Sequence, residues 1–123
     1  MQLDMKKFYE MASKDPEFNK EIRYLNGDVK LVMGDKVYLM IIREGRLIAI
    51  DDTCSKDVPA NIEFSGTEDH WERLTARAPK PFYQVLETAC VKHGMTMTTN
   101  TDTLAYLPAW NRMIYIMRDV CNA

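Results

Sequence analysis

The stretch PANIEFSGTEDHW, residues 59–71, is the most informative part of the chain because a strand pattern passes directly into a helix pattern within it. Ala60, Ile62 and Phe64 alternate with polar residues, which is the period of a half-buried β-strand. A small-residue turn follows, and Thr67 before two acidic residues is typical of a helix N-terminus. The sequence therefore predicts a strand and a helix joined by a very short connection.

Upstream of this stretch, three short strands follow one another closely. Residues 29–33 alternate, residues 37–42 form a continuous apolar run that we expect to be covered on both faces, and residues 47–50 form a third apolar segment. Short turns separate these segments, so they are predicted to pair as an antiparallel sheet. Two helices precede the sheet; the second begins at Asp15-Pro16 and ends at Gly27.

Downstream of the stretch, two further helices and one strand are predicted. A helix is expected to begin near Pro81 and to end at His93-Gly94. Residues 95–99 alternate as a fifth strand, and a last helix runs from Pro108 to about Val120 after a break at the preceding leucine. The helix that begins near Pro81 is expected to turn four apolar side chains inward: Phe82, Val85, Leu86 and Ala89.

The resulting order is α-α-β-β-β-β-α-α-β-α, which lacks the regular alternation of a doubly wound parallel sheet. The sequence therefore predicts an α+β fold with helices packed on one face of a mostly antiparallel sheet. The chain has 123 residues, no internal repeat and no linker, so residues 1–123 are expected to form a single domain. Its 46% hydrophobic and 28% charged residues are typical of a globular protein.

Composition and charge exclude several classes of protein. The chain has 16 Lys and Arg against 18 Asp and Glu, and a net charge of -2 does not suit a surface that binds nucleic acid. No apolar run approaches the ~18 residues of a membrane span, and the N-terminal residues MQLDMKKFYEM lack the apolar region of a secretory signal. The three cysteines suggest no disulfide framework, which favours a reducing, cytoplasmic location.

Most catalytic and cofactor motifs are absent from the sequence. It has no glycine-rich nucleotide-binding loop, no G-x-S-x-G and no C-x-x-C, so no cofactor and no metal are expected. Cys90 and His93 lie on one predicted helix, either as a nucleophile and its base or, as we favour, as a buried thiol beside a helix-terminal histidine. Asp51, Asp52 and Asp57 offer carboxylates for a metal or a general base, or, as we favour, cap the turns of a solvated loop.

Methionine is the unusual component, with nine residues in the chain. Because Met is flexible and polarizable, it fills irregular cores and lines adaptable binding surfaces. If the last helix packs against the sheet, the methionines of the strands and of that helix converge in one volume, which is either a filled core or a pocket. They are Met33, Met40, Met95, Met97, Met113 and Met117.

The order of elements resembles the sterol carrier protein type 2 family, the small sterol-binding or lipid-transfer domain. The resemblance extends from about Phe18 onward and rests on residues 26–32, 37–42 and 44–47 and most strongly on residues 59–71. The late strand departs from the family pattern because polar residues replace its second glycine. The resemblance implies a five-stranded sheet covered by helices, with an internal hydrophobic tunnel for a fatty acid, acyl-CoA or sterol-like lipid and no catalysis.

Three hypotheses for the function remain open. The first is a lipid-binding module that makes transient contact with membranes, in which the last helix is a wall or lid. The second is a small isomerase, hydratase or lyase that uses the same cavity, with Asp51, Asp52 and His93 as acid–base candidates. The third is an interaction domain whose last helix buries its wide apolar face in a homodimer. For the first hypothesis, the predicted lining residues are Met40, Met95, Met97, Trp110, Met113, Ile114 and Met117.

Overall fold

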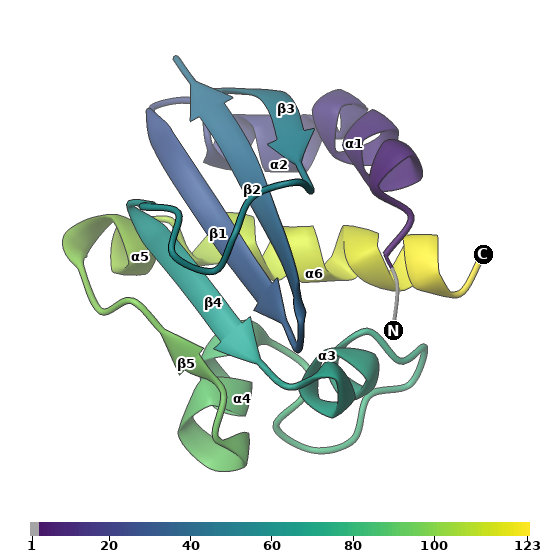
Figure 1. Cartoon of the computed structure of the whole chain (residues 1–123). Helices are drawn as coiled ribbons and strands as arrows, with labels where there is room; N and C mark the ends of the chain where they lie inside the picture. The colour runs from purple at the N-terminus through teal and green to yellow at the C-terminus, as the bar shows by residue number, and fades with distance from the viewer. Residues whose placement is uncertain (1–2) are drawn as a thin grey trace.

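The computed structural model describes residues 3–123 and is built around a five-stranded sheet (Figure 1). Its strands lie in the order β3-β2-β1-β4-β5. The central pair, β1 and β4, is parallel, and the other three pairs are antiparallel. The strands are β1 (Gly27–Met33), β2 (Lys36–Arg43), β3 (Arg46–Asp51), β4 (Ile62–Gly66) and β5 (Thr96–Met97).

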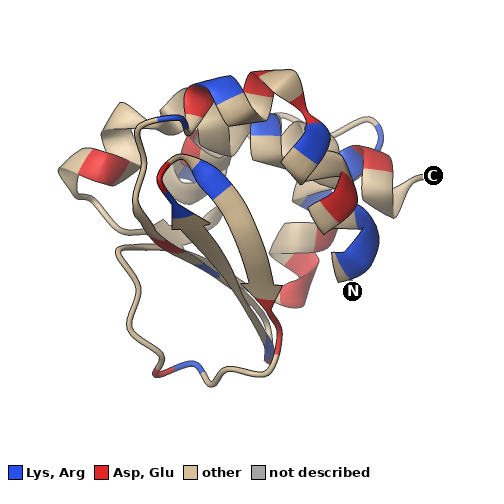
Figure 2. Cartoon of the chain, turned by 90° about the horizontal axis from the view of Figure 1, so that it is seen from above, with Lys and Arg blue, Asp and Glu red and all other residues tan. Residues whose placement is uncertain are grey.

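The described part of the chain contains six helices, and they lie mainly on one side of the sheet (Figures 1 and 2). Two precede the sheet, two connect β4 to β5, and two follow β5. The prediction of an α+β fold with a mostly antiparallel sheet covered by helices is therefore confirmed. The helices are α1 (Met5–Lys14), α2 (Pro16–Glu21), α3 (Glu68–Leu74), α4 (Leu86–His93), α5 (Thr101–Ala105) and α6 (Leu107–Cys121).

The core lies between the sheet and α6, which runs behind the strands in Figure 1. This helix also packs against α1, α2 and α4, so its apolar face is covered from several directions. Burial of each of its large apolar side chains stabilises the fold by about 1.5–3 kcal/mol. The wide apolar face of α6, which suggested a homodimer, is therefore buried against other elements of the same chain. The buried residues of α6 are Ala109, Trp110, Met113, Ile114, Ile116, Met117 and Val120.

The junction between β4 and α3 explains why residues 59–71 set the local fold. The side-chain oxygen of Thr67 accepts from the backbone N–H of His70 at 3.1 Å, and His70 Nδ1 accepts from the N–H of Thr67 at 3.0 Å. This reciprocal pair is a capping box in which a histidine replaces the usual Glu or Gln. The Trp71 indole N–H then donates to the carbonyl of Val32 at 2.8 Å, which fixes α3 against β1.

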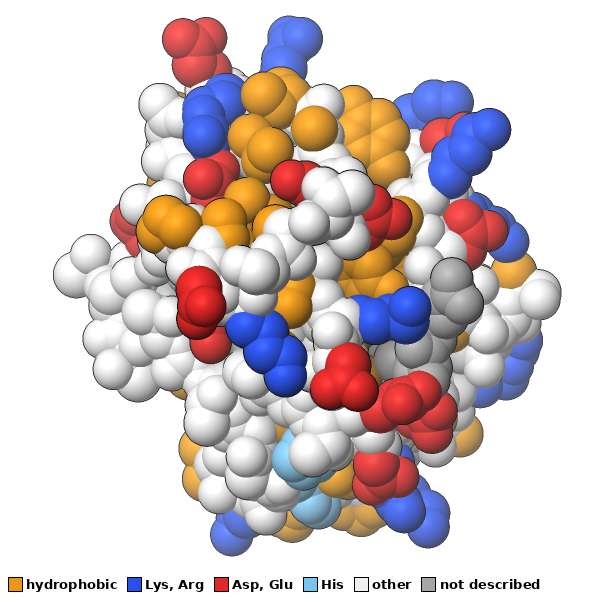
Figure 3. Space-filling view, in the orientation of Figure 1, with side chains coloured by type: hydrophobic (Ala, Val, Ile, Leu, Met, Phe, Trp, Pro, Cys, Tyr) orange, Lys and Arg blue, Asp and Glu red, His pale blue; other side chains and the backbone are white. Residues whose placement is uncertain are grey.

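The other side of the sheet is partly covered by the segment 52–61, which crosses in front of the strands in Figure 1. Lys30 holds this segment because its ammonium donates to the carbonyls of Lys56 and Val58 at 2.7 and 2.9 Å. The same ammonium forms an ion pair with Glu63 at 2.9 Å. Hydrophobic side chains are nevertheless visible on this side over β2 and β3 (Figure 3), where Ile48 of β3 is exposed.

The two edges of the sheet are irregular. The register of β2 and β3 shifts between Ile41 and Ile42, which places a bulge at Ile48. The Tyr9 hydroxyl of α1 donates to the Ile48 carbonyl at 3.3 Å beside this bulge. At the other edge, β5 contains only Thr96 and Met97 of the predicted strand 95–99. It ends early because the following chain turns into α5. The N-cap of α5 is Asn100, whose side-chain amide also donates to the carbonyl of Asn61, directly before β4.

The predicted helix start near Pro81 is wrong, because α4 begins only at Leu86. Phe82 adopts a left-handed backbone conformation with φ of 69°, which interrupts a right-handed helix at this point. Its side chain is therefore exposed rather than inward, and Tyr83 is buried instead. The Thr88 hydroxyl donates to the Phe82 carbonyl at 3.0 Å and helps to hold this turn. The predicted break before α6 lies one residue earlier than expected, at Tyr106.

Candidate functional site

The seven residues predicted to line a cavity lie in, or pack against, one apolar cluster. They come from both sides of the core: one from β2, two from the segment that contains β5, and four from α6. Six of them are buried, and one, Met97, is partly exposed. The structure therefore brings these residues together, but their role in ligand binding stays a prediction. They are Met40, Met95, Met97, Trp110, Met113, Ile114 and Met117.

Trp110 is the fixed element of this cluster. Its indole N–H donates to the carbonyl of Thr103 at 3.0 Å. Its ring meets Phe64 edge to face, with 5.8 Å between the ring centroids. The methionine side chains have no comparable directional contact, and their three rotatable bonds allow them to repack around a different shape. The cluster thus combines one rigid wall with several adaptable side chains.

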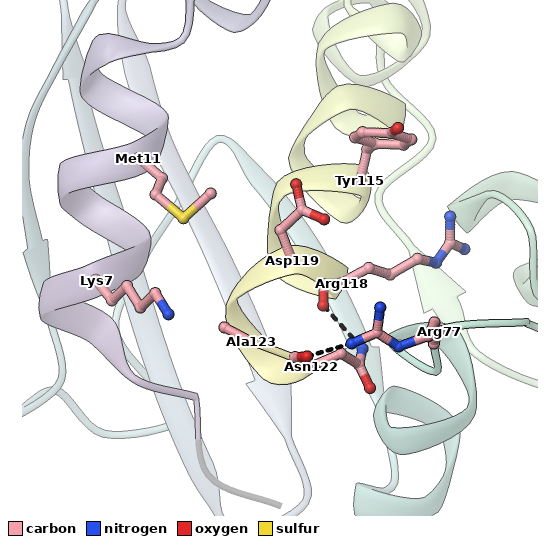
Figure 4. Close-up of a pocket in the computed structure, with 8 residues that line it drawn as sticks. All are labelled: Lys7, Met11, Arg77, Tyr115, Arg118, Asp119, Asn122 and Ala123. Carbon is pink, nitrogen blue, oxygen red and sulfur yellow. Dashed lines mark hydrogen bonds between the residues drawn. The ribbon is translucent and has the colours of Figure 1, made fainter.

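Two surface hollows flank α6 outside this cluster. The larger, of about 480 Å³, lies between α1 and the C-terminal part of α6 (Figure 4). Lys7 and Met11 line it from α1, and Arg77 lines it on the other side and donates to the carbonyl of Asn122. The smaller, of about 350 Å³, lies between α2, the segment before α4 and α6. The hollows share Tyr115 and Arg118, but neither is lined by the seven residues of the cluster.

Arg112 ties α6 to the junction of α1 and α2. Its guanidinium donates to both carboxylate oxygens of Asp15, at 3.0 and 2.7 Å, and also contacts Glu17 at 3.1 Å. The hydrogen bond from Arg112 lowers the pKa of Asp15, and the N–H of Phe18, which this carboxylate caps, acts in the same direction. The same pairing raises the pKa of Arg112. The Asp15 carboxylate therefore caps the N-terminus of α2 and also binds Arg112 of α6.

Arg118 ties the next turn of α6 to the segment between α3 and α4. Its guanidinium donates to the carbonyls of Leu74, Tyr83 and Gln84, at 3.0, 2.9 and 2.7 Å. Burial lowers the pKa of this guanidinium. Movement of α6 away from the sheet must therefore break or stretch two sets of charged hydrogen bonds, one on each side of the smaller hollow.

The proposed acid–base candidates lie at opposite edges of the sheet and have separate local partners. Asp51, in the edge strand β3, accepts from the hydroxyl and the N–H of Thr53 at 2.6 and 2.8 Å, and both bonds lower its pKa. His93, at the end of α4, bonds to the carbonyl of Pro81 at 3.0 Å and stacks on Tyr83 with 3.8 Å between centroids. These contacts favour the structural interpretation of both residues. Asp52 lines a separate shallow hollow beside β2.

Cys90 does not have the environment of a nucleophile. Burial raises the pKa of its thiol to about 11, and the charge of Glu87 acts in the same direction. A reactive thiol requires the opposite shift, because the thiolate is the nucleophile. Across residues 3–123, His, Cys, Asp and Glu side chains form no group of three or more that is placed to hold a metal ion. None of the helices in this part of the chain has the length and apolar character needed to cross a membrane.

Sequence reasoning missed one buried polar pair, which lies between α4 and α6. The side-chain amide of Asn111 donates to Glu87 Oε1 at 3.3 Å. The remaining oxygens, Glu87 Oε2 and Asn111 Oδ1, are buried and have no hydrogen-bond partner. Asn111 is the signal that the sequence did contain, because it is an uncharged polar residue directly after Trp110, three residues before the apolar Ile114.

Solved structures share this fold over almost the whole chain. A crystal structure of sterol carrier protein 2 has a TM-score of 0.75 and 12% sequence identity, covering 94% of this chain and 94% of that chain. A conserved hypothetical protein from Thermus thermophilus has a TM-score of 0.69 and 13% identity, covering 94% and 85%. The sterol carrier protein domain 2 of Helicoverpa armigera has a TM-score of 0.59 and 12% identity, covering 89% and 84%.

These neighbours define the class of fold. The chain has the sterol carrier protein 2 fold, as the resemblance in the sequence predicted. No protein-family model matches the sequence, and no curated protein matches it either. At identities of 12–13% the likeness establishes architecture alone. The function must therefore be argued from the side chains of this chain.

Proposed function

We propose that the protein binds a hydrophobic ligand between the sheet and α6, without catalysis. The ligand class is a fatty acid, acyl-CoA or sterol-like lipid. The observation that carries this proposal is that the seven predicted residues, from the sheet side and from α6, all belong to or pack against the one hydrophobic core of the protein. The fold supports it, because neighbours of the same architecture are named as sterol carrier proteins.

The driving force is removal of the apolar ligand from water. Each Å² of apolar surface buried contributes ~25 cal/mol, so a long acyl chain supplies several kcal/mol with few polar contacts. Methionine side chains allow one cavity to fit ligands of different shape. We therefore expect broad selectivity for the apolar part of the ligand.

Ligand entry requires a displacement of α6 or of its side chains, because five of the seven residues are fully buried. The helix is flanked by two surface hollows and held by the contacts of Arg112 and Arg118. In this proposal α6 is a lid, the hollows are the places where it separates from its neighbours, and the two arginines set the free energy of opening. A tunnel then forms as the methionines repack around the ligand.

The test is lipid binding by the purified protein. Mass spectrometry of an organic extract identifies lipid that co-purifies, and titration with a fluorescent fatty acid measures affinity. Met113→Phe fills part of the cluster and is expected to weaken binding about tenfold. Val91→Phe, at an exposed position of α4 that lines neither hollow, is the control and keeps the affinity of the wild type. A protein that carries no lipid and binds no probe refutes the proposal.

Three further predictions from the sequence accompany this proposal. A homodimer is tested by size-exclusion chromatography with light scattering, with and without lipid. Transient membrane contact is tested by sedimentation with vesicles. The cytoplasmic location is tested by fractionation of cells that express the full chain.

A further inference from the structure

The buried pair between α4 and α6 is a polar feature that an apolar cavity alone does not explain. Glu87 is the second residue of α4, and Asn111 lies in the second turn of α6. Their single mutual hydrogen bond, of 3.3 Å from Asn111 Nδ2 to Glu87 Oε1, is long. The two remaining side-chain oxygens are buried, and both are acceptors without a donor.

Two buried acceptors without donors destabilise the fold unless something else donates to them. An unsatisfied buried polar group loses its hydrogen bonds to water on folding without replacement, and the loss is larger when the group is charged. Native structures contain few such groups, and each requires an explanation such as a water molecule or a ligand. Neither Glu87 nor Asn111 is paired with a cation within residues 3–123. The pair therefore provides negative character and two free acceptor oxygens, and its one remaining donor is the second N–H of the Asn111 amide.

Glu87 and Asn111 are partly exposed as residues, but their two unpartnered oxygens are buried. Cys90 lies one helical turn after Glu87, and burial together with the charge of Glu87 raises the pKa of its thiol to about 11. The next buried residues of α6 after Asn111 are Met113 and Ile114, which belong to the apolar cluster. The pair therefore lies beside the apolar cluster, at the contact of α6 with α4.

Asn111 also connects the pair to the surface. It lines the hollow of about 350 Å³ between α2, the segment before α4 and α6. Val85 and Pro108 supply apolar walls to the same hollow. Glu87 is absent from the lining of this hollow and is linked to it by the hydrogen bond from Asn111.

We propose that Glu87 and Asn111 form the headgroup site of the ligand and that this site selects uncharged lipids with hydroxyl headgroups over carboxylates. The inference rests on the proposed function and adds its ligand class. A hydroxyl donates to an unpartnered oxygen, whereas an ionised fatty acid presents only acceptors and a second negative charge. A monoacylglycerol carries two hydroxyls and matches both free oxygens, a long-chain alcohol matches one, and a fatty acid matches neither.

The experiment compares three ligands with the same acyl length at neutral pH. Monopalmitoylglycerol, hexadecanol and palmitate each compete with one fluorescent lipid probe, on wild type, on Glu87→Gln and on Glu10→Gln. Glu10, exposed on α1, is the control for loss of a carboxylate outside the pair. Thermal melts establish that each variant is folded, and Asn111→Leu is the second variant if Glu87→Gln does not fold.

The expected result on wild type is monoacylglycerol first, alcohol second and palmitate last, with about tenfold weaker binding of palmitate than of the alcohol. Glu87→Gln removes the charge and adds a donor, so palmitate gains about tenfold while Glu10→Gln changes nothing. For Asn111→Leu, loss of one acceptor removes the advantage of the monoacylglycerol over the alcohol.

Two results overturn the inference and leave the proposed function standing. One is palmitate binding as tightly as the alcohol on wild type. The other is an unchanged ranking in the folded pair variants, which means that the headgroup lies elsewhere and that water satisfies the pair. Failure of all three lipids and of the probe to bind refutes the proposed function itself, and the inference with it.

Discussion

Replacement of Arg112 by Gln tests whether α6 is held in place by a small number of charged contacts. The substitution removes two hydrogen bonds to Asp15, of 3.0 and 2.7 Å, and one contact with Glu17. The two side chains of the main pair are 26% and 13% exposed, so solvent screens the interaction only in part. Bonds to charged groups contribute about 1.5–3 kcal/mol.

The expected loss lies near the lower end of that range. Asp15 keeps its bond to the N–H of Phe18 at 2.7 Å and so is not left without a partner when Arg112 is removed. We expect the free energy of unfolding to fall by about 1.5 kcal/mol. Urea denaturation followed by circular dichroism measures it, provided that the slope of the transition is unchanged. Arg73→Gln, which removes an exposed ion pair with Asp69, is the control and leaves the midpoint unchanged.

The pH dependence gives an independent check. The pKa of Asp15 is lowered below its ordinary value of 3.8 in the folded protein, chiefly by Arg112. Its contribution to stability is therefore complete above about pH 4 and is lost as the pH falls through the lowered pKa. The difference in stability between wild type and Arg112→Gln is expected to narrow between about pH 4 and pH 2.

A double-mutant cycle separates the ion pair from the other contacts of Arg112. Asp15→Asn keeps a good N-cap for α2 but removes the charge, so its combination with Arg112→Gln measures the coupling between the two charges. A coupling energy below about 0.5 kcal/mol would show that the pair does not hold α6. If α6 is the lid, Arg112→Gln also admits a fluorescent lipid faster in stopped-flow mixing. An unchanged association rate contradicts the lid but not the ion pair.

Three other perturbations probe the fold and the site. Lys30→Met removes the buried ammonium that holds residues 52–61, so we expect a loss of about 2 kcal/mol by urea denaturation and faster proteolysis of that segment; an unchanged cleavage rate contradicts it. In Gly94→Ala the added Cβ meets no neighbouring atom, but the backbone φ of 82° is unfavourable for alanine. We therefore expect thermal unfolding to show that the free energy of unfolding falls by about 1 kcal/mol because of backbone strain alone. Alkylation of Cys90, measured by peptide mass spectrometry, is expected to rise about tenfold per pH unit between about pH 8 and pH 10, and a plateau below pH 9 would contradict the raised pKa.

Local patterns in the sequence predicted most of the sheet. Residues 29–33, 37–42 and 47–50 all lie in strands, because alternation and short turns are local properties that the chain keeps on folding. The parallel pairing of β1 with β4 was not predicted. It joins segments about thirty residues apart, and no local signal specifies which strand lies beside which.

The segment between α3 and α4 was the main error of the sequence prediction. The apolar spacing of Phe82, Val85 and Leu86 fits a helix, but Phe82 adopts a left-handed conformation and faces solvent. That conformation is held by distant partners, among them Arg118, which binds two carbonyls of the segment. Tertiary contacts of this kind override local spacing and leave no pattern in the segment itself.

The sequence indicated the apolar face of α6 but not the polar pair beside it. The apolar residues of α6 were recognised as a wide face, and the structure buries that face among sheet and helices. Glu87 gave no such signal, because a glutamate in the first turn of a helix usually serves the helix dipole at the surface. Only the packing of α4 on α6 places its carboxylate beside Asn111 and buries its Oε2 atom.

The irregular edges of the sheet have a consequence for behaviour at high concentration. An edge strand with a long straight row of free backbone groups recruits strands from other molecules and starts aggregation. Here one edge is bent by the bulge at Ile48 and bonded to Tyr9, and the other edge is only two residues long. Intermolecular strand addition therefore has little template on either side, and the protein is expected to stay dispersed at high concentration.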